Sequence, residues 1–272
     1  MTVNHWVAGS SPARGAKFKW GLNCRPQNKD IMAARLFNPN SQEPFTLSRS
    51  RVDNFLECQR CFYLTNRLGI ARPSTFPFNL NNAVDELLKN EFDGYREKQE
   101  PHPIQEENNL NAIPYQHPDL EDWRESLRKG IKRFHEPTNL LLRGGVDDVW
   151  INKKTKQLIV VDYKATSKKG EVSLDADWQI GYKRQVEFYQ WLFRENFDVS
   201  DTAYFVYCNG IKDKPEFNNQ LEFKVKLIPY IGDDSWVEPT LVDIKYCLLA
   251  ENPPEASDDC SYCKYVTKTL TV

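Results

Sequence analysis

The sequence lacks several features that define particular classes of protein, and each absence argues against one of those classes. No stretch approaches the roughly 20 consecutive apolar residues that a membrane-spanning helix requires. The first residues lack the apolar core of a secretory signal peptide. We therefore expect a cytoplasmic protein that does not enter a membrane. In that compartment thiols stay reduced, so the seven cysteines are not expected to form a disulfide framework.

Positive charge is not in excess either, because 36 lysines and arginines face 38 aspartates and glutamates. The formal net charge of −2 excludes a domain that binds nucleic acid through its overall charge. It leaves open a local basic groove beside a carboxylate-rich metal site. The Gly-x-x-x-x-Gly-Lys-Ser/Thr loop that binds nucleotide phosphates is also missing, so any ATP-driven unwinding would have to come from another chain.

Residues 1–40 differ in composition from the rest of the chain. They are rich in Gly, Ser, Pro, Asn and basic residues and have no apolar period, which predicts a disordered leader. The run from Gly9 to Pro12 can be encoded by a DNA sequence that resembles the T-arm consensus of a transfer-RNA gene. Our hypothesis is that translation starts at Met32 and that the leader is wrongly assigned. Residues 45–266 are expected to form a single domain with its own core.

Apolar periodicity predicts both helices and strands in the rest of the chain. A polar run at 153–156 predicts a hairpin turn between two of the strands. The resulting order, a mixed sheet flanked by helices, places the chain in the α/β class. The expected helices are 48–64, 81–98, 120–135, 176–196 and 235–250, and the expected strands are 140–152, 157–165, 203–208 and 221–229.

Two charged residues end an otherwise apolar strand face. Asp162 and Lys164 are two positions apart, so both side chains leave the sheet on one face. Leu158 and Val160 precede them on that face. Unpaired buried charges are costly, which makes the pair hard to explain as core. A salt bridge at the strand end is the ordinary alternative, but the surrounding motifs favour a catalytic role.

Another carboxylate is expected on the neighbouring strand. The segment Gly144–Asp147 places it after two glycines, which permit close approach of a backbone or a ligand. Carboxylates on adjacent strands can hold Mg²⁺ or Mn²⁺. Asp147 and Asp162 are the predicted ligands, and Asp148 is an alternative to Asp147. Lys164 would orient the attacking water or stabilise the charge that develops on the scissile phosphate.

Together these residues resemble the PD-(D/E)XK nuclease superfamily. The pattern of Gly-x-x-Asp, an apolar strand and Asp-x-Lys matches residues 144–147, 158–161 and 162–164. Gln185 and Tyr189 match the Gln-x-x-x-Tyr helix of its RecB-like exonuclease branch, and their spacing puts both on one helix face. Residues 47–64 look like the opening helix of that branch. The resemblance implies a restriction-endonuclease-like core and a supporting role for Gln185 and Tyr189 in catalysis.

One position departs from the pattern of the branch. Its members usually carry a His on the second helix as an additional metal ligand, and Asp85 stands at the matching place here. Aspartate is a good ligand for hard cations, so the resemblance implies that Asp85 completes the metal site. A solvated helix residue is the ordinary alternative.

Two Cys-x-x-Cys pairs lie near the two ends of the expected domain. Cys58 and Cys61 form the first pair, and Cys260 and Cys263 form the second. Four thiolates suit Zn²⁺ or an iron–sulfur cluster, and such a site would tie the ends of the domain together. Several RecB-like nucleases carry a [4Fe–4S] cluster, with one cysteine before the core and three after it. We expect such a cluster, with structural zinc as the alternative because the division here is two and two.

The combined motifs predict a Mg²⁺- or Mn²⁺-dependent deoxyribonuclease. The resemblance implies an exonuclease that acts on single strands or ends of DNA in repair or recombination, with a helicase or repair protein on another chain as partner. A non-catalytic DNA-binding or scaffold protein built around the four cysteines is the alternative from another class. RNA is an alternative substrate, because metal-assisted hydrolysis does not itself select the sugar.

Overall fold

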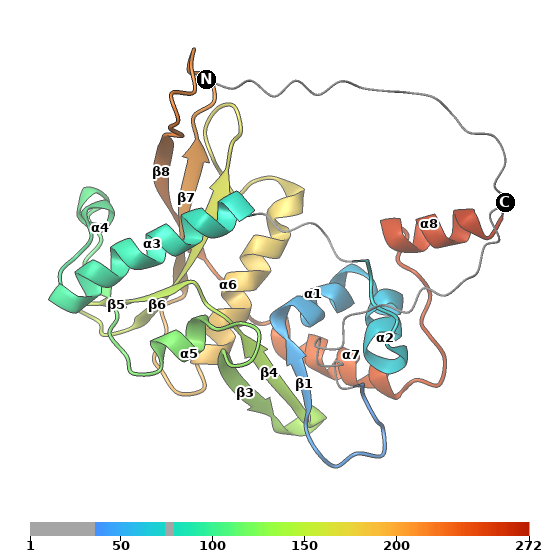
Figure 1. The fold of residues 1–272 in the computed structure, drawn as a ribbon. Coiled ribbons are helices and arrows are strands. Elements are labelled where there is room, and N and C mark those ends of the chain that lie inside the picture. The colour runs from blue at the N-terminus through green and yellow to red at the C-terminus, as the bar shows by residue number, and fades with distance from the viewer. Residues whose placement is uncertain (1–35, 74–78, 272) are drawn as a thin grey trace, which may run out of the picture. The chain divides into compact units, whose positions relative to one another are not determined.

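The computed structural model describes residues 36–73 and 79–271 (Figure 1). Residues 1–35, with Met32 and most of the predicted leader, lie outside this range, so the leader and the start-site hypothesis stay predictions. Residues 36–40 are described, and Phe37 is buried edge-on against Phe45 with 5.3 Å between the ring centroids. All described residues belong to one compact unit, residues 35–272.

A five-stranded mixed sheet forms the centre of the fold. Its strands are β2 (Ala112–Pro114), β5 (Asp148–Asn152), β6 (Leu158–Thr166), β7 (Thr202–Gly210) and β8 (Phe223–Ile231). The strand order is β2-β5-β6-β7-β8, and only β6 and β7 run parallel to each other. The predicted hairpin is confirmed, because β5 and β6 pair as antiparallel neighbours around the polar turn at 153–156.

A second sheet of three strands was not expected from the sequence. It contains β1 (Phe45–Ser48), β3 (Ile131–His135) and β4 (Leu140–Gly144), with β1 parallel and β3 antiparallel to the central β4. The expected single strand 140–152 is therefore wrong, since it divides into β4 and β5 in different sheets. The ladder breaks where the backbone N–H of Val146 donates to the carbonyl of Trp123, at 3.0 Å, instead of to a strand.

The expected helix 120–135 is wrong beyond its first turn. Helix α5 (Leu120–Arg124) ends early, and residues 131–135 form strand β3. The Glu125 carboxylate accepts hydrogen bonds of 2.9–3.1 Å from the backbone N–H groups of residues 127–129, which replaces helical bonding there. Gly130 then adopts φ +76°, a left-handed conformation that glycine reaches at little cost, and the chain enters β3.

The expected helix 48–64 consists of two helices. Helix α1 (Arg49–Glu57) and helix α2 (Gln59–Leu68) are separated by Cys58, whose backbone is extended with φ −162° and ψ 106°. Cys58 therefore ends one helix and caps the start of the next.

The remaining helices lie close to the predicted positions, with two additions. The additions are α4 (Pro103–Glu107) and α8 (Ser261–Thr269). The helices that the sequence predicted are α3 (Asn79–Lys98), α6 (Ile180–Phe193) and α7 (Val237–Leu249). Over residues 36–73 and 79–271, no helix is both long and apolar enough to cross a membrane.

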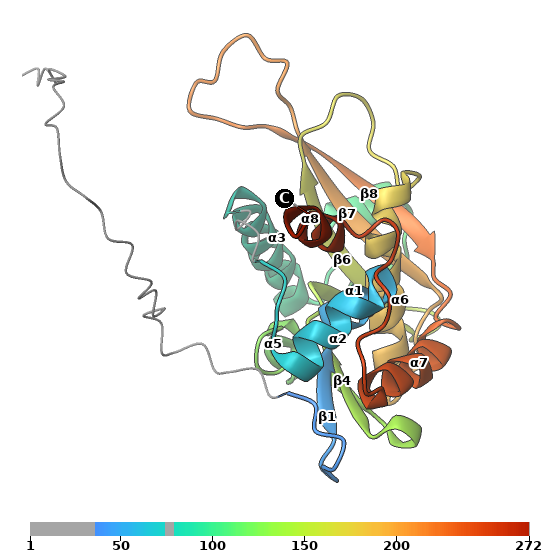
Figure 2. The ribbon, with the colours of Figure 1, turned by 90° about the vertical axis from the view of Figure 1, so that its right-hand side faces the viewer.

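The two faces of the five-stranded sheet pack against different helices. Leu158 and Val160 of β6 belong to the core shared with α6, and Ile159 and Val161 belong to the core shared with α3. Helices α3 and α6 both pack against this sheet (Figure 1). Helices α1, α2 and α7 lie together beside β1 and β4 (Figure 2). The α/β class is confirmed, with two mixed sheets flanked by helices. Because Asp162 is in phase with Val160, it extends the face that α6 covers.

Candidate active site and four-cysteine site

Asp162 and Lys164 form an ion pair at the end of the apolar face of β6. The Asp162 side chain is fully buried, with 0% of its surface exposed. Apart from the ion pair, neither of its carboxylate oxygens has a hydrogen-bond partner among the described residues. A buried carboxylate without such partners is energetically costly. The lone pairs of Asp162 are free to bind a cation, which would offset this cost.

Asp147 lies between β4 and β5 and faces the same pair. Its Oδ2 accepts a hydrogen bond of 2.9 Å from the backbone N–H of Tyr163, the residue between Asp162 and Lys164. Burial, followed by the negative charge of Asp162, raises the pKa of Asp147 to about 6. A divalent cation would relieve the repulsion between these two buried carboxylates. The donor set therefore fits Mg²⁺ or Mn²⁺.

Lys164 supplies the positive charge of this site. Burial alone would lower its pKa, but Asp162 and Asp147 raise it above the ordinary value, so the ammonium form is favoured. Its Nζ donates to Oε1 of Gln185 at 3.4 Å and lies 4.6 Å from the ring centroid of Tyr182. Both of these residues lie on α6, which therefore helps to hold the ammonium in place.

The two predicted residues of α6 are brought together with the Gly-x-x-Asp segment. Nε2 of Gln185 donates to the hydroxyl oxygen of Tyr189 at 3.3 Å. Tyr189 is buried, and burial raises the pKa of its hydroxyl, so it stays protonated. A Cβ atom at Gly144 would lie 2.5 Å from Cε1 of Tyr189. Gly144 of the Gly-x-x-Asp segment thus leaves the space that the ring of Tyr189 fills.

Asp148 has a different role from its neighbour Asp147. It is fully buried on the α3 side of the sheet, where the two arginines of α3 and α5 reach it. Its oxygens already accept hydrogen bonds from several donors, so the alternative assignment of Asp148 as a metal ligand has no support in the contacts. The donors are Arg96, Arg124, the backbone N–H of Val149, the Trp150 indole and the Tyr163 hydroxyl.

Asp85 is less closely associated with the acidic pair. Its Oδ2 lies 2.7 Å from Nζ of Lys89, one helical turn farther along α3. Burial and the charge of Asp147 raise the pKa of Asp85, so the two carboxylates do sense each other. In the described part of the chain, however, the only group of three or more ligand atoms within 4.8 Å of one another is made of cysteines. The predicted Asp85, Asp147 and Asp162 are not that close together.

Sequence reasoning assigned no role to two residues of the site. Tyr182 places its ring beside the Lys164 ammonium. Arg49, at the start of α1, forms an ion pair with Asp53. Burial alone would lower the pKa of Arg49, but the nearby Tyr189, Asp53 and Asp162 raise it. Its position within the opening-helix segment was the available signal, but that segment does not say which side chain faces the site.

The predicted cysteines do come together, although the pairs are far apart in sequence. Their sulfur atoms all lie within 4.8 Å of one another, and the residues of this four-cysteine site are Cys58, Cys61, Cys260 and Cys263. None of the four forms a disulfide. Burial would raise the pKa of Cys58, but hydrogen bonds from the backbone at Cys61 and Ser257 and from neighbouring thiols lower it to about 6. At Cys58 this favours the thiolate, the form that binds metals, whereas burial raises the pKa of Cys61 and Cys263.

The family model described as "PD-(D/E)XK nuclease superfamily" matches residues 46–267. No match was found among curated proteins. One solved structure found by the comparison is described as "Crystal structure of SSO0001", with 16% sequence identity, a TM-score of 0.39, and coverage of 84% of this chain and 86% of that one.

Proposed function

Because the chain belongs to the PD-(D/E)XK nuclease superfamily, we propose that it is a metal-dependent nuclease that hydrolyses phosphodiester bonds of DNA. The observation that carries the proposal is the buried Asp162 carboxylate, whose oxygens have no hydrogen-bond partner in the described chain beyond the Lys164 ion pair. Asp147 adds a second carboxylate beside it. A buried excess of negative charge suits a divalent cation and has no evident purpose in a purely structural core.

Asp147 and Asp162 would hold Mg²⁺ or Mn²⁺, with Asp85 as a more distant candidate. A bound cation of this kind would lower the pKa of water and polarise a phosphoryl oxygen. Lys164 would supply a positive charge to the scissile phosphate, since its ammonium form is favoured. Gln185 would orient the ammonium through its amide oxygen.

A basic hollow near the end of β6 supports a polyanionic substrate. It has a volume of about 730 Å³, and its lining begins at Lys168, just after β6, the strand that carries Asp162. Phosphates of a nucleic-acid strand bind such clusters of ammonium groups. Its lysines are Lys168, Lys169, Lys212 and Lys224.

The finer parts of the proposal rest on the resemblance to the RecB-like branch. The Gln185 and Tyr189 pair on α6 supports an exonuclease that acts on single strands or DNA ends, in repair or recombination. Such an enzyme would work in the cytoplasm with a helicase or repair protein on another chain.

The test is cleavage of end-labelled single-stranded DNA, double-stranded DNA and RNA by anaerobically purified protein with Mg²⁺, Mn²⁺ or EDTA. We expect metal-dependent cleavage of DNA, and we expect its loss in an Asp162→Ala variant. The product ladder gives the polarity. A folded protein that binds DNA but cleaves no substrate under any condition would overturn the proposal in favour of a binding or scaffold role.

A further inference from the structure

The four-cysteine site is built from two matching pieces of chain. Cys58 is the N-cap of α2 and Cys61 lies in its first turn, while Cys260 is the N-cap of α8 and Cys263 lies in the first turn of that helix. The positive ends of two helix dipoles therefore face the four sulfurs. Such ends stabilise thiolates, which are the ligands that a metal requires.

The sulfur separations distinguish between the two candidate cofactors. They are 3.5 Å for Cys61–Cys260, 3.7 Å for Cys61–Cys263 and 3.9 Å for Cys58–Cys263. Four sulfurs on one tetrahedral Zn²⁺ ion at about 2.3 Å lie roughly 3.8 Å from one another. In a [4Fe–4S] cluster each thiolate binds a different iron at a corner of a cube, so the sulfurs must stand well farther apart. These three separations fit a single ion, and the limit of 4.8 Å that holds for all four sulfurs is too short for the cluster.

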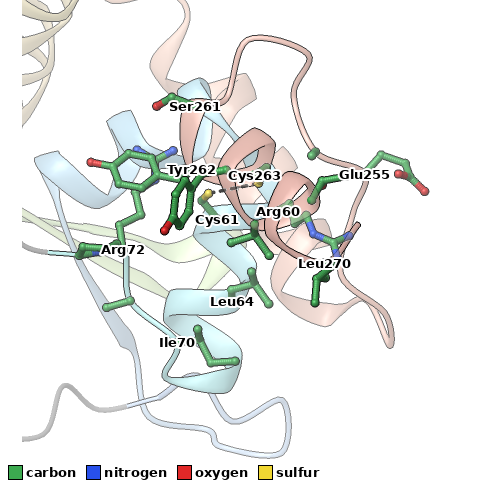
Figure 3. A pocket seen from close by; sticks show the side chains of 16 residues that line it. Arg60, Cys61, Leu64, Ile70, Arg72, Glu255, Ser261, Tyr262, Cys263 and Leu270 are labelled. Atoms are coloured by element: carbon green, nitrogen blue, oxygen red, sulfur yellow. Dashed lines mark hydrogen bonds between the residues drawn. The ribbon is translucent and has the colours of Figure 1, made fainter. Parts of the chain in front are cut away.

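The second half of the site belongs to a helix with little other attachment. No residue of α8 is buried, and Tyr265 and Val266 are more than half exposed, at 70% and 55%. Between α2 and α8 lies a hollow of about 580 Å³, lined on the α2 side by Leu64 and Ile70 (Figure 3). Because apolar packing does not fill this space, it cannot supply the main attachment of α8.

One polar contact supports the site from outside. Nη2 of Arg72 lies 4.0 Å from Sγ of Cys260, and the guanidinium stacks on the ring of Tyr262 at 4.8 Å from the ring centroid. Figure 3 shows Arg72 and Tyr262 beside the sulfurs of Cys61 and Cys263, which face each other. Four thiolates on one divalent ion keep a net negative charge, which the arginine offsets.

We propose that the four-cysteine site holds a single structural Zn²⁺ ion in place of an iron–sulfur cluster, and that this ion is the main attachment of α8 to the domain. The proposal concerns the cysteines alone and does not depend on the nuclease activity. It replaces the cluster expected from the resemblance with the alternative that the geometry favours.

Metal analysis of the full chain, purified anaerobically without added metal, gives the first test. We expect about one zinc per chain, no stoichiometric iron, and no visible absorption. Exchange of zinc for Co²⁺ would give the blue-green spectrum of a tetrahedral thiolate site. Iron and sulfide in stoichiometric amounts with a brown absorption would overturn the proposal. So would a protein that contains neither metal.

Variants and hydrogen exchange test the attachment of α8. Cys61→Ser should lose zinc and the exchange protection of residues 261–269, whereas Cys208→Ser, which changes a buried thiol of β7 outside the site, should keep both. If Cys61→Ser fails to fold, removal of zinc from the native protein with a strong chelator gives the same comparison. Exchange in α8 that is unchanged after zinc loss would show that the ion does not hold this helix.

Discussion

The acidic site and the four-cysteine site each join two segments of chain, but the surroundings that they would offer a metal ion are very different. Asp147 and Asp162 come from the two sides of one hairpin, and within the described residues the oxygens of Asp162 have only the Lys164 ion pair. Cys61 and Cys260 are 199 residues apart in the chain, and the four sulfurs of the site lie within 4.8 Å of one another. Catalytic metal sites keep positions open for water and substrate, and structural sites do not. If both proposals hold, the fold separates a site for chemistry from a site for structural attachment.

Treatment with a chelator should give the largest difference between the acidic site and the four-cysteine site. A brief treatment with EDTA should abolish DNA cleavage, because two carboxylates bind a hard cation weakly, and excess Mg²⁺ should restore it fully. The zinc content of the same sample should not change during a brief treatment, because a closed structural site has no open position for the chelator. Elemental analysis beside a cleavage gel makes the comparison. Recovery that required added zinc would show that the two sites are not independent.

Replacement of Lys164 tests whether the acidic site is catalytic or only structural. We expect Lys164→Ala to lower kcat by about 100-fold, because a charge near the scissile phosphate is removed. The Mg²⁺ concentration for half-maximal activity should not rise, since removal of a neighbouring cation does not weaken metal binding. Lys153→Ala, on the exposed hairpin turn, is the matched control and should behave as the parent. A higher Mg²⁺ requirement in Lys164→Ala would indicate a collapsed site.

Gly144→Ala tests the packing of Tyr189 against the Gly-x-x-Asp segment. The new Cβ would lie 2.5 Å from Cε1 of Tyr189, so we expect the free energy of unfolding to fall by about 1–3 kcal/mol. The control is Gly181→Ala on α6, where a Cβ meets no atom within 4 Å and the helix gains about 0.5–1 kcal/mol. Urea denaturation measures both. Equal stability of the two variants would contradict the close approach of Tyr189.

The basic hollow should give the smallest effect, seen in binding more than in chemistry. Lys168→Glu with Lys169→Glu should weaken binding of long DNA and lower the log–log slope of affinity against salt by about 0.7–0.9 for each phosphate that is no longer bound. Cleavage of a short chromogenic phosphodiester should not change. Lys153→Glu with Lys154→Glu, on the hairpin turn, is the charge-matched control. A slope that fell equally in both pairs would show a general charge effect instead of a binding surface.

Sequence alone identified the parts of the site that depend on local spacing. Asp162 and Lys164 share a strand face, and Gln185 contacts Tyr189 four residues away, because these relations follow from the geometry of single elements. It did not identify Arg49 or Tyr182, since their proximity to the site depends on how α1 and α6 pack.

The fold was predicted less well where pairing is distant in sequence. Residues 131–135 were predicted as the end of a helix, but they form β3 because they pair with β4, and this pairing cannot be read from the local pattern. The cysteine pairs were visible in the sequence, but the distances between their sulfurs, which separate zinc from a cluster, depend on the whole domain.

The distance along the chain between the two cysteine pairs also affects how the protein is made. Cys61 is synthesised 199 residues before Cys260, which corresponds to about 10–40 s of translation at typical rates. During that interval the first pair of thiols has no native partners, so it is open to oxidation or to capture by another metal. A cell that kept its thiols less reduced would be expected to lose this protein at the ribosome before it lost the finished molecule.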